Sequence, residues 1–296
     1  MTNGLSILIP CRDYICTPLA EQLAKQAASI KGLAFEVIVI DDGSTNAKMV
    51  EVNATISRKA YCRHINLAEN QGRAKVRNTL AREAQYDNLL FIDCKHGLPD
   101  NSFVRRYVEH AECDVVNGGI RIAGDQHLLR GNLRFIYEKS AERTHTALRR
   151  SGEEYRDFRT TNFMVKRSVM LAHPFDETIT HYGYEDVLFG KQLKEAGIRI
   201  THIDNPVVFS HFESNKSFVA KTDEALHTLH GHASQLQGYS KLLYIYNKVS
   251  RLHLAWLLRL TWILFGKAMR SNLTGNKPSL TVFKLYKLCL LVSLYY

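Results

Sequence analysis

Three short apolar segments, each leading into an acidic residue, constrain the fold of this chain more than any other feature. The segments and their acids are residues 5–10 before Asp13, residues 35–40 before Asp41 and Asp42, and residues 89–92 before Asp93. Predominantly apolar segments of this length are typical of strands buried on both faces of a parallel sheet. Because parallel strands end at one edge, where open α/β sheets bind ligands, the acids predict a binding site there. Each acid alone is also consistent with a turn or a helix N-cap.

Helix patterns separate the apolar segments, at residues 19–30, 49–59 and 73–84. This alternation predicts an α/β fold in which right-handed crossovers connect the strands of a mostly parallel sheet flanked by helices. Further along the chain, the spacing of apolar residues predicts helices at residues 103–111, 126–150 and 185–196, and strands at residues 114–117 and 163–166.

The composition is that of a globular protein, since 45% of the 296 residues are hydrophobic and 23% are charged. The six cysteines form no Cys-x-x-Cys pair, which argues against a zinc site, and we expect them to be reduced in a cytosol. The first residues lack a basic region followed by a long apolar one, so no secretory signal is expected.

The net charge of +10 is concentrated near the C-terminus. From residue 216 onward there are eleven Lys and Arg residues, and the only acids are Asp223 and Glu224. A basic segment of this kind favours an anionic membrane surface or nucleic acid as a partner.

Apolar helices are expected in the same region, at residues 242–248, 252–269 and 282–296. Arg259 and Lys267 interrupt the longest of them, whereas a membrane-spanning helix needs about 20 residues with few charges. Two interpretations remain open: helices lying in a membrane interface, or a helical appendage packed on the sheet domain. The high aliphatic content argues against nucleic acid as a partner.

Six motifs occur in order along the first 213 residues: ILIPCRD, VIDDGS, NQGRAKVRN, LLFIDCK, GYEDVLFGKQLKEAG and VFSHFE. Together they resemble the GT-A type glycosyltransferases of family 2. The resemblance implies a Rossmann-like GT-A domain at residues 1–213, with a nucleotide-binding half at 1–100 and an acceptor-binding half at 101–213. The basic, apolar helical region would then be residues 214–296.

The resemblance also implies a set of donor-binding residues. Asp42 matches the family's uracil and ribose contact, and a basic residue at Arg73 or Arg77 could meet phosphate oxygens, although exposed helix arginines are an equal alternative. The full set that the resemblance assigns to nucleotide binding is Pro10, Arg12, Asp13, Asp41, Asp42, Arg73, Arg77, Asp93 and Lys95.

LLFIDCK resembles the family's DxD motif, whose acids hold a divalent ion, but Lys95 replaces the second acid. A protonated lysine cannot coordinate a cation. We expect Mn²⁺ or Mg²⁺ to be held by Asp93 and His211, which lies where related enzymes place a histidine ligand. His96 as a ligand, Lys95 as the partner of the diphosphate, and an inactive enzyme are the alternatives, and a structural role for His211 is another.

Glu185 and Asp186 resemble the family's acidic pair, in which Asp186 would be the general base and Glu185 its catalytic neighbour. Gly183 and Tyr184 would contribute to the acceptor site. The alternative is that both acids only stabilise the N-terminus of a helix.

The resemblance therefore implies inverting transfer of one sugar from a nucleotide-sugar donor, expected to be UDP-linked, to a glycan or lipid-linked acceptor. Such a reaction belongs to cell-surface polysaccharide biosynthesis, in the cytoplasm at the inner face of the cytoplasmic membrane. The rival interpretations are a non-catalytic nucleotide-sugar-binding protein, suggested by Lys95, and a basic nucleic-acid-binding protein. We expect no nucleic-acid partner.

Overall fold

A computed structural model describes residues 4–296 of the chain. These residues form two compact units, which are described separately. Unit 1 comprises residues 4–121, Thr144–Thr180 and Phe189–His211, and unit 2 comprises Ile122–Arg143, His181–Leu188 and Phe212–Tyr296. The division into a nucleotide-binding half, an acceptor-binding half and a C-terminal region stays a prediction.

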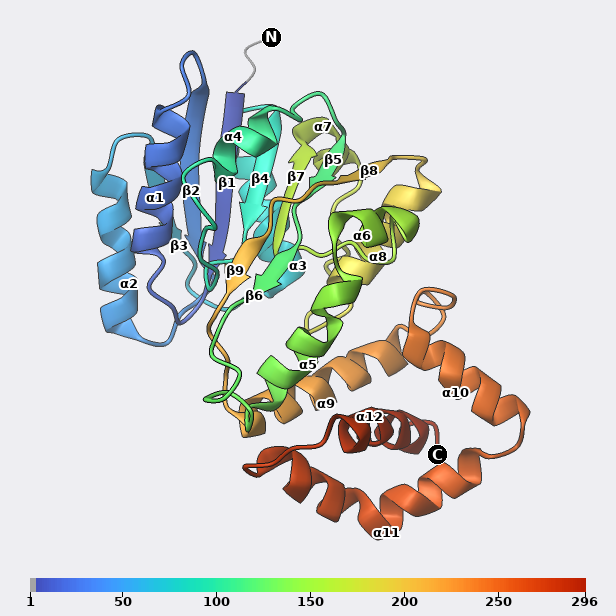
Figure 1. Ribbon diagram of the computed structural model, residues 1–296. Helices are drawn as coiled ribbons and strands as arrows, with labels where there is room; N and C mark the ends of the chain where they lie inside the picture. The colour runs from blue at the N-terminus through green and yellow to red at the C-terminus, as the bar shows by residue number, and fades with distance from the viewer. Residues whose placement is uncertain (1–3) are drawn as a thin grey trace. The chain divides into compact units, whose positions relative to one another are not determined.

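Unit 1 is built on a seven-stranded sheet with the strand order β3-β2-β1-β4-β7-β5-β8 (Figure 1). Its strands are β1 (Gly4–Cys11), β2 (Ala34–Asp41), β3 (Cys62–Asn66), β4 (Asn88–Ile92), β5 (Val115–Asn117), β7 (Asn162–Lys166) and β8 (Ile200–His202). Strand β1 pairs in parallel with β2 and β4, and β7 is antiparallel to both β4 and β5. The prediction of a mostly parallel sheet flanked by helices is confirmed.

Both faces of this sheet are covered. The helices of unit 1 are α1 (Thr17–Ala28), α2 (Ala47–Ala54), η1 (Thr55–Arg58), α3 (Arg73–Glu83), α4 (Phe103–Val108), α6 (Ala147–Gly152) and α7 (Arg167–Ala172). A small second sheet pairs β6 (Ile120–Ile122) with β9 (Val207–Phe209), and α8 (Glu185–Glu195) begins in unit 2 and ends in unit 1.

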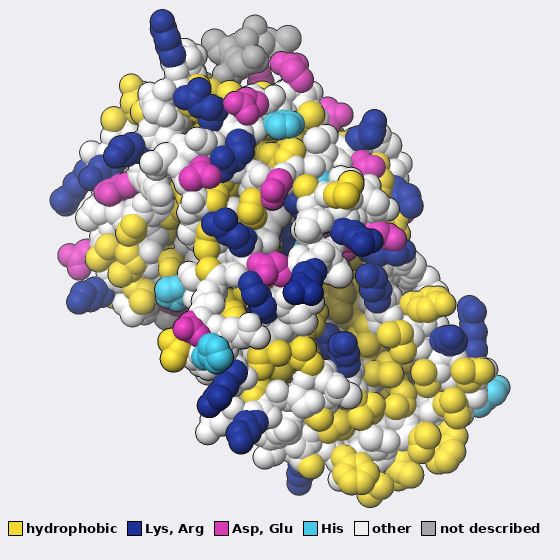
Figure 2. Space-filling model, viewed as in Figure 1, with side chains coloured by type: hydrophobic (Ala, Val, Ile, Leu, Met, Phe, Trp, Pro, Cys, Tyr) yellow, Lys and Arg dark blue, Asp and Glu magenta, His cyan; other side chains and the backbone are white. Residues whose placement is uncertain are grey.

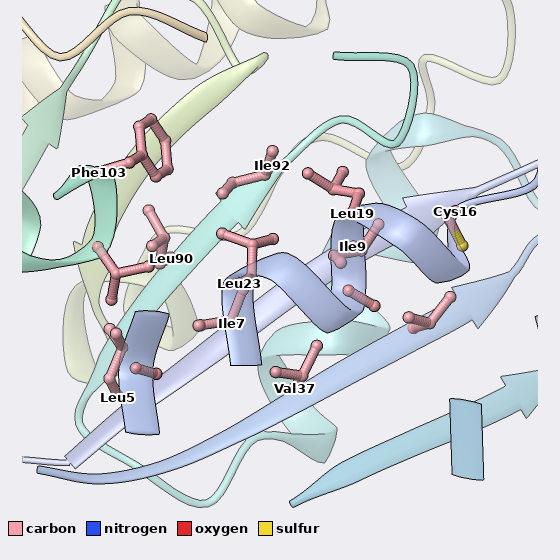
Figure 3. Packing of buried hydrophobic residues seen from close by; sticks show 14 of the residues in the cluster. Leu5, Ile7, Ile9, Cys16, Leu19, Leu23, Val37, Leu90, Ile92 and Phe103 are labelled. Atoms are coloured by element: carbon pink, nitrogen blue, oxygen red, sulfur yellow. The ribbon is translucent and has the colours of Figure 1, made fainter. Parts of the chain in front are cut away.

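Alternate residues of β1 pack into two different apolar clusters, as the period of a strand requires. Ile7 and Ile9 lie in the cluster under α1, together with Leu19 and Leu23 (Figure 3), whereas Leu8 lies in the cluster on the other face. Burying one such aliphatic side chain stabilises the fold by about 1.5–3 kcal/mol. The mostly apolar sequence of β1 is therefore explained by burial on both faces.

Unit 2 is mainly helical. Its helices are α5 (Leu133–Ala141), α9 (Asn215–Gly231), α10 (Lys241–Arg251), α11 (Ala255–Thr274) and α12 (Leu280–Ser293), and η2 (Glu142–Thr144) follows α5. Ser214, Ser240 and Ser279 begin α9, α10 and α12, each accepting a hydrogen bond from the backbone N–H three residues later. Such N-caps satisfy donors that the helix itself leaves unpaired.

The single helix predicted at residues 126–150 is wrong. The structure divides this region into α5, η2 and α6, because polar side chains cap new helix starts within it. Asn132 accepts a hydrogen bond from the backbone N–H of Phe135, and Thr146 accepts one from that of Arg149. Side chains of this kind compete with a continuous helix for the backbone.

Candidate functional site

The carboxyl ends of β2, β1 and β4 lie next to one another in unit 1. The chain order changes direction across β1, with β2 on one side and β4 on the other, and open α/β sheets bind ligands at such a point. Asp42 follows β2, Asp13 follows β1 and Asp93 follows β4. The three acids predicted to share an edge of the sheet are thus brought together by the parallel pairing.

Asp13 joins the turn after β1 to the turn after β2. Its carboxylate accepts hydrogen bonds from the backbone N–H of Thr45 at 2.8 Å and of Asn46 at 3.2 Å. Desolvation opposes a charge on this carboxyl, but these hydrogen bonds prevail and lower its pKa. Asp13 has a φ of 46°. Pro10 is half-buried at the end of β1, and Arg12 is exposed. The hydrogen bonds of Asp13 therefore fix the turn after β1, and the Arg12 side chain faces solvent.

Asp41 and Asp42 hold the loops around the end of β2. The Asp41 carboxylate accepts hydrogen bonds from the backbone N–H and the hydroxyl of Ser44, at 2.8 and 2.9 Å. Asp42, which is 5% exposed, accepts from the backbone N–H groups of Gln71 at 2.7 Å and Gly72 at 3.1 Å. Burial raises the pKa of Asp42, although these two donors oppose the shift. Asp42 thus fixes the entry to α3, and its contact with a nucleotide stays a prediction.

Arg77 is not the exposed helix arginine that the sequence left open as an alternative. Its side chain is buried, and its Nη2 lies 2.9 Å from Oδ1 of Asp93. Burial alone would raise the pKa of Asp93, but the charges of Arg77, Arg73 and His96 hold it below its usual value. Asp93 is therefore ionised and surrounded by positively charged side chains. Of these, Arg73 is exposed to solvent.

Lys95 and His211 both contact the ring of Tyr14. The Lys95 Nζ lies 5.8 Å from the ring centroid, and the His211 ring meets the same ring edge-on at 5.7 Å. Backbone hydrogen bonds between Gly97 and Val208, at 2.9 and 2.8 Å, bring β9 beside the loop that follows β4. The second residue of the altered DxD motif and the predicted histidine ligand therefore converge on one tyrosine.

Tyr14 was not among the site residues predicted from the sequence. The residue directly follows the charged turn that had been assigned to nucleotide binding, and this proximity was the one available signal. Tyr14 gains its importance from contacts with residues about 80 and 200 positions away, which no local pattern reveals.

The described part of the chain, residues 4–296, contains no group of three His, Cys, Asp or Glu side chains placed to hold a metal ion. An ion at Asp93 would also compete with the guanidinium of Arg77, which already contacts one carboxylate oxygen. These residues therefore do not form a complete metal site by themselves. Coordination of Mn²⁺ or Mg²⁺ by Asp93 and His211 stays a prediction.

In unit 2, the predicted acidic pair begins α8. The carbonyl of Tyr184 accepts the first helical hydrogen bond, from the N–H of Leu188 at 3.0 Å. Gly183 has a φ of 99° and Tyr184 a φ of 68°, a conformation that costs a residue with a side chain about 1–3 kcal/mol. Glu185 is buried and Asp186 is half-buried in the first turn, where the helix dipole favours negative charge. A strained segment thus presents the two acids.

Unit 2 also exposes an unusual number of large apolar side chains, which we call the apolar surface. It consists of Tyr244, Ile245, Leu252, Leu254, Trp256, Leu257, Leu260, Ile263, Leu264, Phe265, Leu285, Tyr295 and Tyr296. Figure 2 shows hydrophobic side chains gathered over α10, α11 and α12, with Lys and Arg side chains at the margin. Among residues 4–296, no helix is both long and apolar enough to cross a membrane.

Comparisons with known proteins identify the family of the chain. The family model described as "Glycosyl transferase family 2" matches residues 6–172, more than half of the chain. An uncharacterized glycosyltransferase of Haemophilus influenzae is 27% identical over 161 residues, which cover 47% of this chain and 64% of that protein. The chain thus spans less than two thirds of the length of this curated relative.

Two solved structures resemble the chain in fold. The mannosyltransferase PcManGT from Pyrobaculum calidifontis, in complex with GDP-Man and Mn²⁺, has a TM-score of 0.61 at 14% identity, over 98% of this chain and 86% of that one. S. aureus TarS 1–349, in complex with UDP-GlcNAc, has a TM-score of 0.50 at 16% identity, over 99% and 91% of the two chains. The chain has a GT-A-like fold and belongs to glycosyl transferase family 2.

Proposed function

We propose that this protein transfers one sugar, with inversion, from a nucleotide-sugar donor to a glycan or lipid-linked acceptor in cell-surface polysaccharide biosynthesis. The observation that carries the proposal is the convergence of Asp13, Asp42 and Asp93 at the carboxyl edge of three adjacent parallel strands. Membership of the family and the nucleotide sugars bound by two proteins of similar fold support it.

The donor nucleotide would lie against the turns after β1 and β2. Pro10, Arg12 and Asp13 would line the base, and Asp42 would face the base or ribose from the loop that it holds in place. Because the solved relatives bind a uridine and a guanosine nucleotide sugar, UDP and GDP are both candidates, with UDP expected from the sequence.

The diphosphate of the donor needs positive charge, since two negative phosphates must be held close to a carboxylate. Lys95 is exposed beside Tyr14, and Arg73 is exposed at the start of α3. A divalent ion, if bound at Asp93 and His211, would supply further charge to the leaving phosphate. The comparison of donor binding with and without Mn²⁺ separates these two sources of charge.

Asp186 would accept the proton of the acceptor hydroxyl, with Glu185 beside it and with Gly183 and Tyr184 contributing to the acceptor site. A general base of this kind contributes about 10²–10⁴ in rate. We therefore expect Asp186→Asn to lower kcat by about 10²–10⁴ and to leave the Kd of the donor unchanged, measured by nucleotide release and by calorimetric titration. Near-normal transfer by the variant would contradict the assignment of the base.

The alternative function is binding of a nucleotide sugar without transfer, and Lys95 at the second acidic position of the motif is the observation that favours it. A protein of this kind would bind the donor and release no nucleotide. Its properties would be unchanged by Asp186→Asn, so the same experiment distinguishes the two functions.

We further propose that the apolar surface docks on an anionic membrane, at the inner face of the cytoplasmic membrane. Five of its residues follow a helical period on α11, namely Trp256, Leu257, Leu260, Ile263 and Leu264, so one face of this helix is apolar and exposed. Soluble proteins rarely leave an apolar face of this extent in water.

The charge beside this face favours a lipid surface as its partner. Lys248, Arg251, Arg259 and Lys267 are exposed on or between α10 and α11, and the sequence contains no acid after Glu224. Basic side chains near anionic headgroups contribute about 1 kcal/mol each, while the apolar side chains enter the interface.

Sedimentation with vesicles tests this docking. We expect the full chain to bind vesicles that contain phosphatidylglycerol more strongly than vesicles of phosphatidylcholine alone. A triple variant, Trp256→Ser, Ile263→Ser and Phe265→Ser, should lose this binding. The control carries Leu128→Ser and Leu148→Ser, which change leucines that are exposed outside the C-terminal helices.

Two results would contradict the membrane proposal. One is unchanged vesicle binding by the triple variant. The other is self-association of the full chain without lipid, measured by analytical ultracentrifugation and abolished by the triple variant, since the apolar surface would then be an interface between copies of the chain.

A further inference from the structure

The segment before the acidic pair is held by a helix that none of the motifs includes. Within unit 2, α9 contacts residue Tyr182 at both of its backbone polar groups. The N–H of Tyr182 donates to Oε1 of Glu224 at 2.9 Å. The hydroxyl of Thr228 lies 3.1 Å from the carbonyl oxygen of Tyr182 and 3.2 Å from that of Glu224, so its one proton is shared between these two acceptors. Glu224 and Thr228 are four residues apart, so they lie one above the other on the same face of α9.

The next residue along is packed just as closely against α9. A Cβ atom placed on Gly183 would lie 2.9 Å from the Cβ of Ala225, which is closer than two non-bonded carbon atoms can approach. Together with its φ of 99°, this contact explains why a glycine precedes Tyr184. The backbone of residues 182 and 183 is therefore held against one helix by the hydrogen bonds of Tyr182 and by the close approach of Gly183 to Ala225.

The contacts of α9 with residues 182 and 183 help to determine the position of Asp186. Tyr184 keeps a left-handed conformation that persists only where surrounding contacts over-determine it. Its carbonyl accepts the first helical hydrogen bond of α8, from Leu188, so the position of Tyr184 sets where the first turn begins. Glu185 and Asp186 occupy that turn.

We propose that Glu224 is a positioning residue for Asp186 and acts through the backbone of Tyr182, with Thr228 as its partner. The inference rests on the proposed function, in which Asp186 is the general base. Glu224 itself touches neither donor nor acceptor in this scheme. It fixes the strained segment whose end places the base, and a misplacement of about 1 Å is enough to lower a rate about 10²-fold.

Two pairs of variants test the role of these side chains in transfer. Glu224→Ala removes the carboxylate oxygen that accepts the hydrogen bond from Tyr182, whereas Glu224→Gln keeps an oxygen that can accept it. Thr228→Val removes the hydroxyl that donates a hydrogen bond, at nearly constant side-chain volume, whereas Thr228→Ser keeps this hydroxyl. We expect Glu224→Ala and Thr228→Val to lower kcat about 10- to 100-fold, with the KM and Kd of the donor within about twofold, and we expect the two conservative variants to restore most of the rate.

Hydrogen exchange gives a readout that needs no turnover. In Glu224→Ala, the backbone amides of Tyr182 and Leu188 should exchange at least about tenfold faster, because the contact that orders the segment is lost. The amide of Ala196, which closes the last turn of α8 by donating to Gln192, should be unchanged. Unchanged exchange at both Tyr182 and Leu188 in a folded variant would overturn the inference.

The outcome for Asp186→Asn, measured in parallel, separates this inference from the function on which it rests. If Asp186→Asn transfers sugar normally, the assignment of the base fails. If Asp186→Asn is inactive while Glu224→Ala retains the full kcat, or loses rate and donor binding equally, the positioning role alone is wrong.

Discussion

Individual side chains in this protein serve the fold and the candidate site together, and Asp93 is the clearest case. Its carboxylate is the partner of the buried Arg77 guanidinium, at 2.9 Å, and it also occupies the first position of the altered DxD motif. An ion pair of this kind adds little net stability, but removing one partner leaves an uncompensated buried charge.

We therefore expect Asp93→Asn to lower the free energy of unfolding by about 3 kcal/mol, measured by urea denaturation. The double variant Asp93→Asn, Arg77→Met should recover much of this loss, because it removes both charges. A single variant as stable as the unmodified protein would show that Arg77 reaches water or another partner once Asp93 is neutral.

The lowered pKa of Asp13 predicts that the free energy of unfolding depends on pH. Hydrogen bonds from Thr45 and Asn46 outweigh desolvation and hold its folded pKa below the unfolded value of about 3.9. A carboxyl with a depressed folded pKa contributes stability above the unfolded pKa and loses it as the pH falls through the folded pKa. The difference in unfolding free energy between the unmodified protein and Asp13→Asn should therefore be constant from pH 7 to 5 and shrink below pH 4. A constant difference down to pH 3 would contradict this role.

Helices and strands could be predicted from the sequence where apolar patterns are local. The segments that became β1, β2 and β4 are buried on both faces, so most of their residues are apolar and the strands are easily recognised, although β1 contains the buried Ser6 and β2 the buried Glu36. The direction of β7 could not be predicted, because a strand buried on both faces has the same apolar pattern whichever way it runs.

Helix α9 shows a different limit. No helix was predicted at residues 215–231, where α9 lies, because the apolar helices of the C-terminal region were expected only from residue 242 onward. The signal was present, since Ser214 caps the helix and Phe218, Thr222 and Leu229 are buried along it. The contacts of Glu224 and Thr228 with Tyr182 join residues more than 40 positions apart, and no local pattern could reveal them.

The packing of α9 on α11 and α12 includes one polar connection that can be tested. The Tyr286 hydroxyl donates to Asp223 at 2.8 Å, and Arg270 donates to the same carboxylate at 2.6 Å. We expect Tyr286→Phe to lower the free energy of unfolding by about 1–2 kcal/mol, because a buried hydrogen bond to a charged group is lost. Tyr244→Phe, at an exposed tyrosine, is the matched control and should change stability little. Equal effects of the two changes in thermal unfolding would contradict the role of this connection.

The residues with proposed functions are divided between the two units of the chain. Unit 1 contains the predicted donor residues that follow β1, β2 and β4, and unit 2 contains the acidic pair, the segment held by α9 and the apolar surface. Because α9 supports the segment before the acidic pair, deleting the C-terminal helices would disturb more than membrane docking. Substitutions on the exposed face of α11 are therefore the better test of docking.

Use of a nucleotide-sugar donor is tested by calorimetric titration of UDP and of GDP into the full chain, with and without Mn²⁺, and with Asp42→Ala as the control. We expect one of the two nucleotides to bind with a Kd between about 1 μM and 1 mM, a range common for enzyme substrates, and we expect Asp42→Ala to weaken this binding. Binding that requires Mn²⁺ would support a metal at Asp93 and His211, and binding indifferent to Mn²⁺ would assign the diphosphate to Lys95. Failure of both nucleotides to bind under either condition would contradict the proposal that this chain uses a nucleotide-sugar donor.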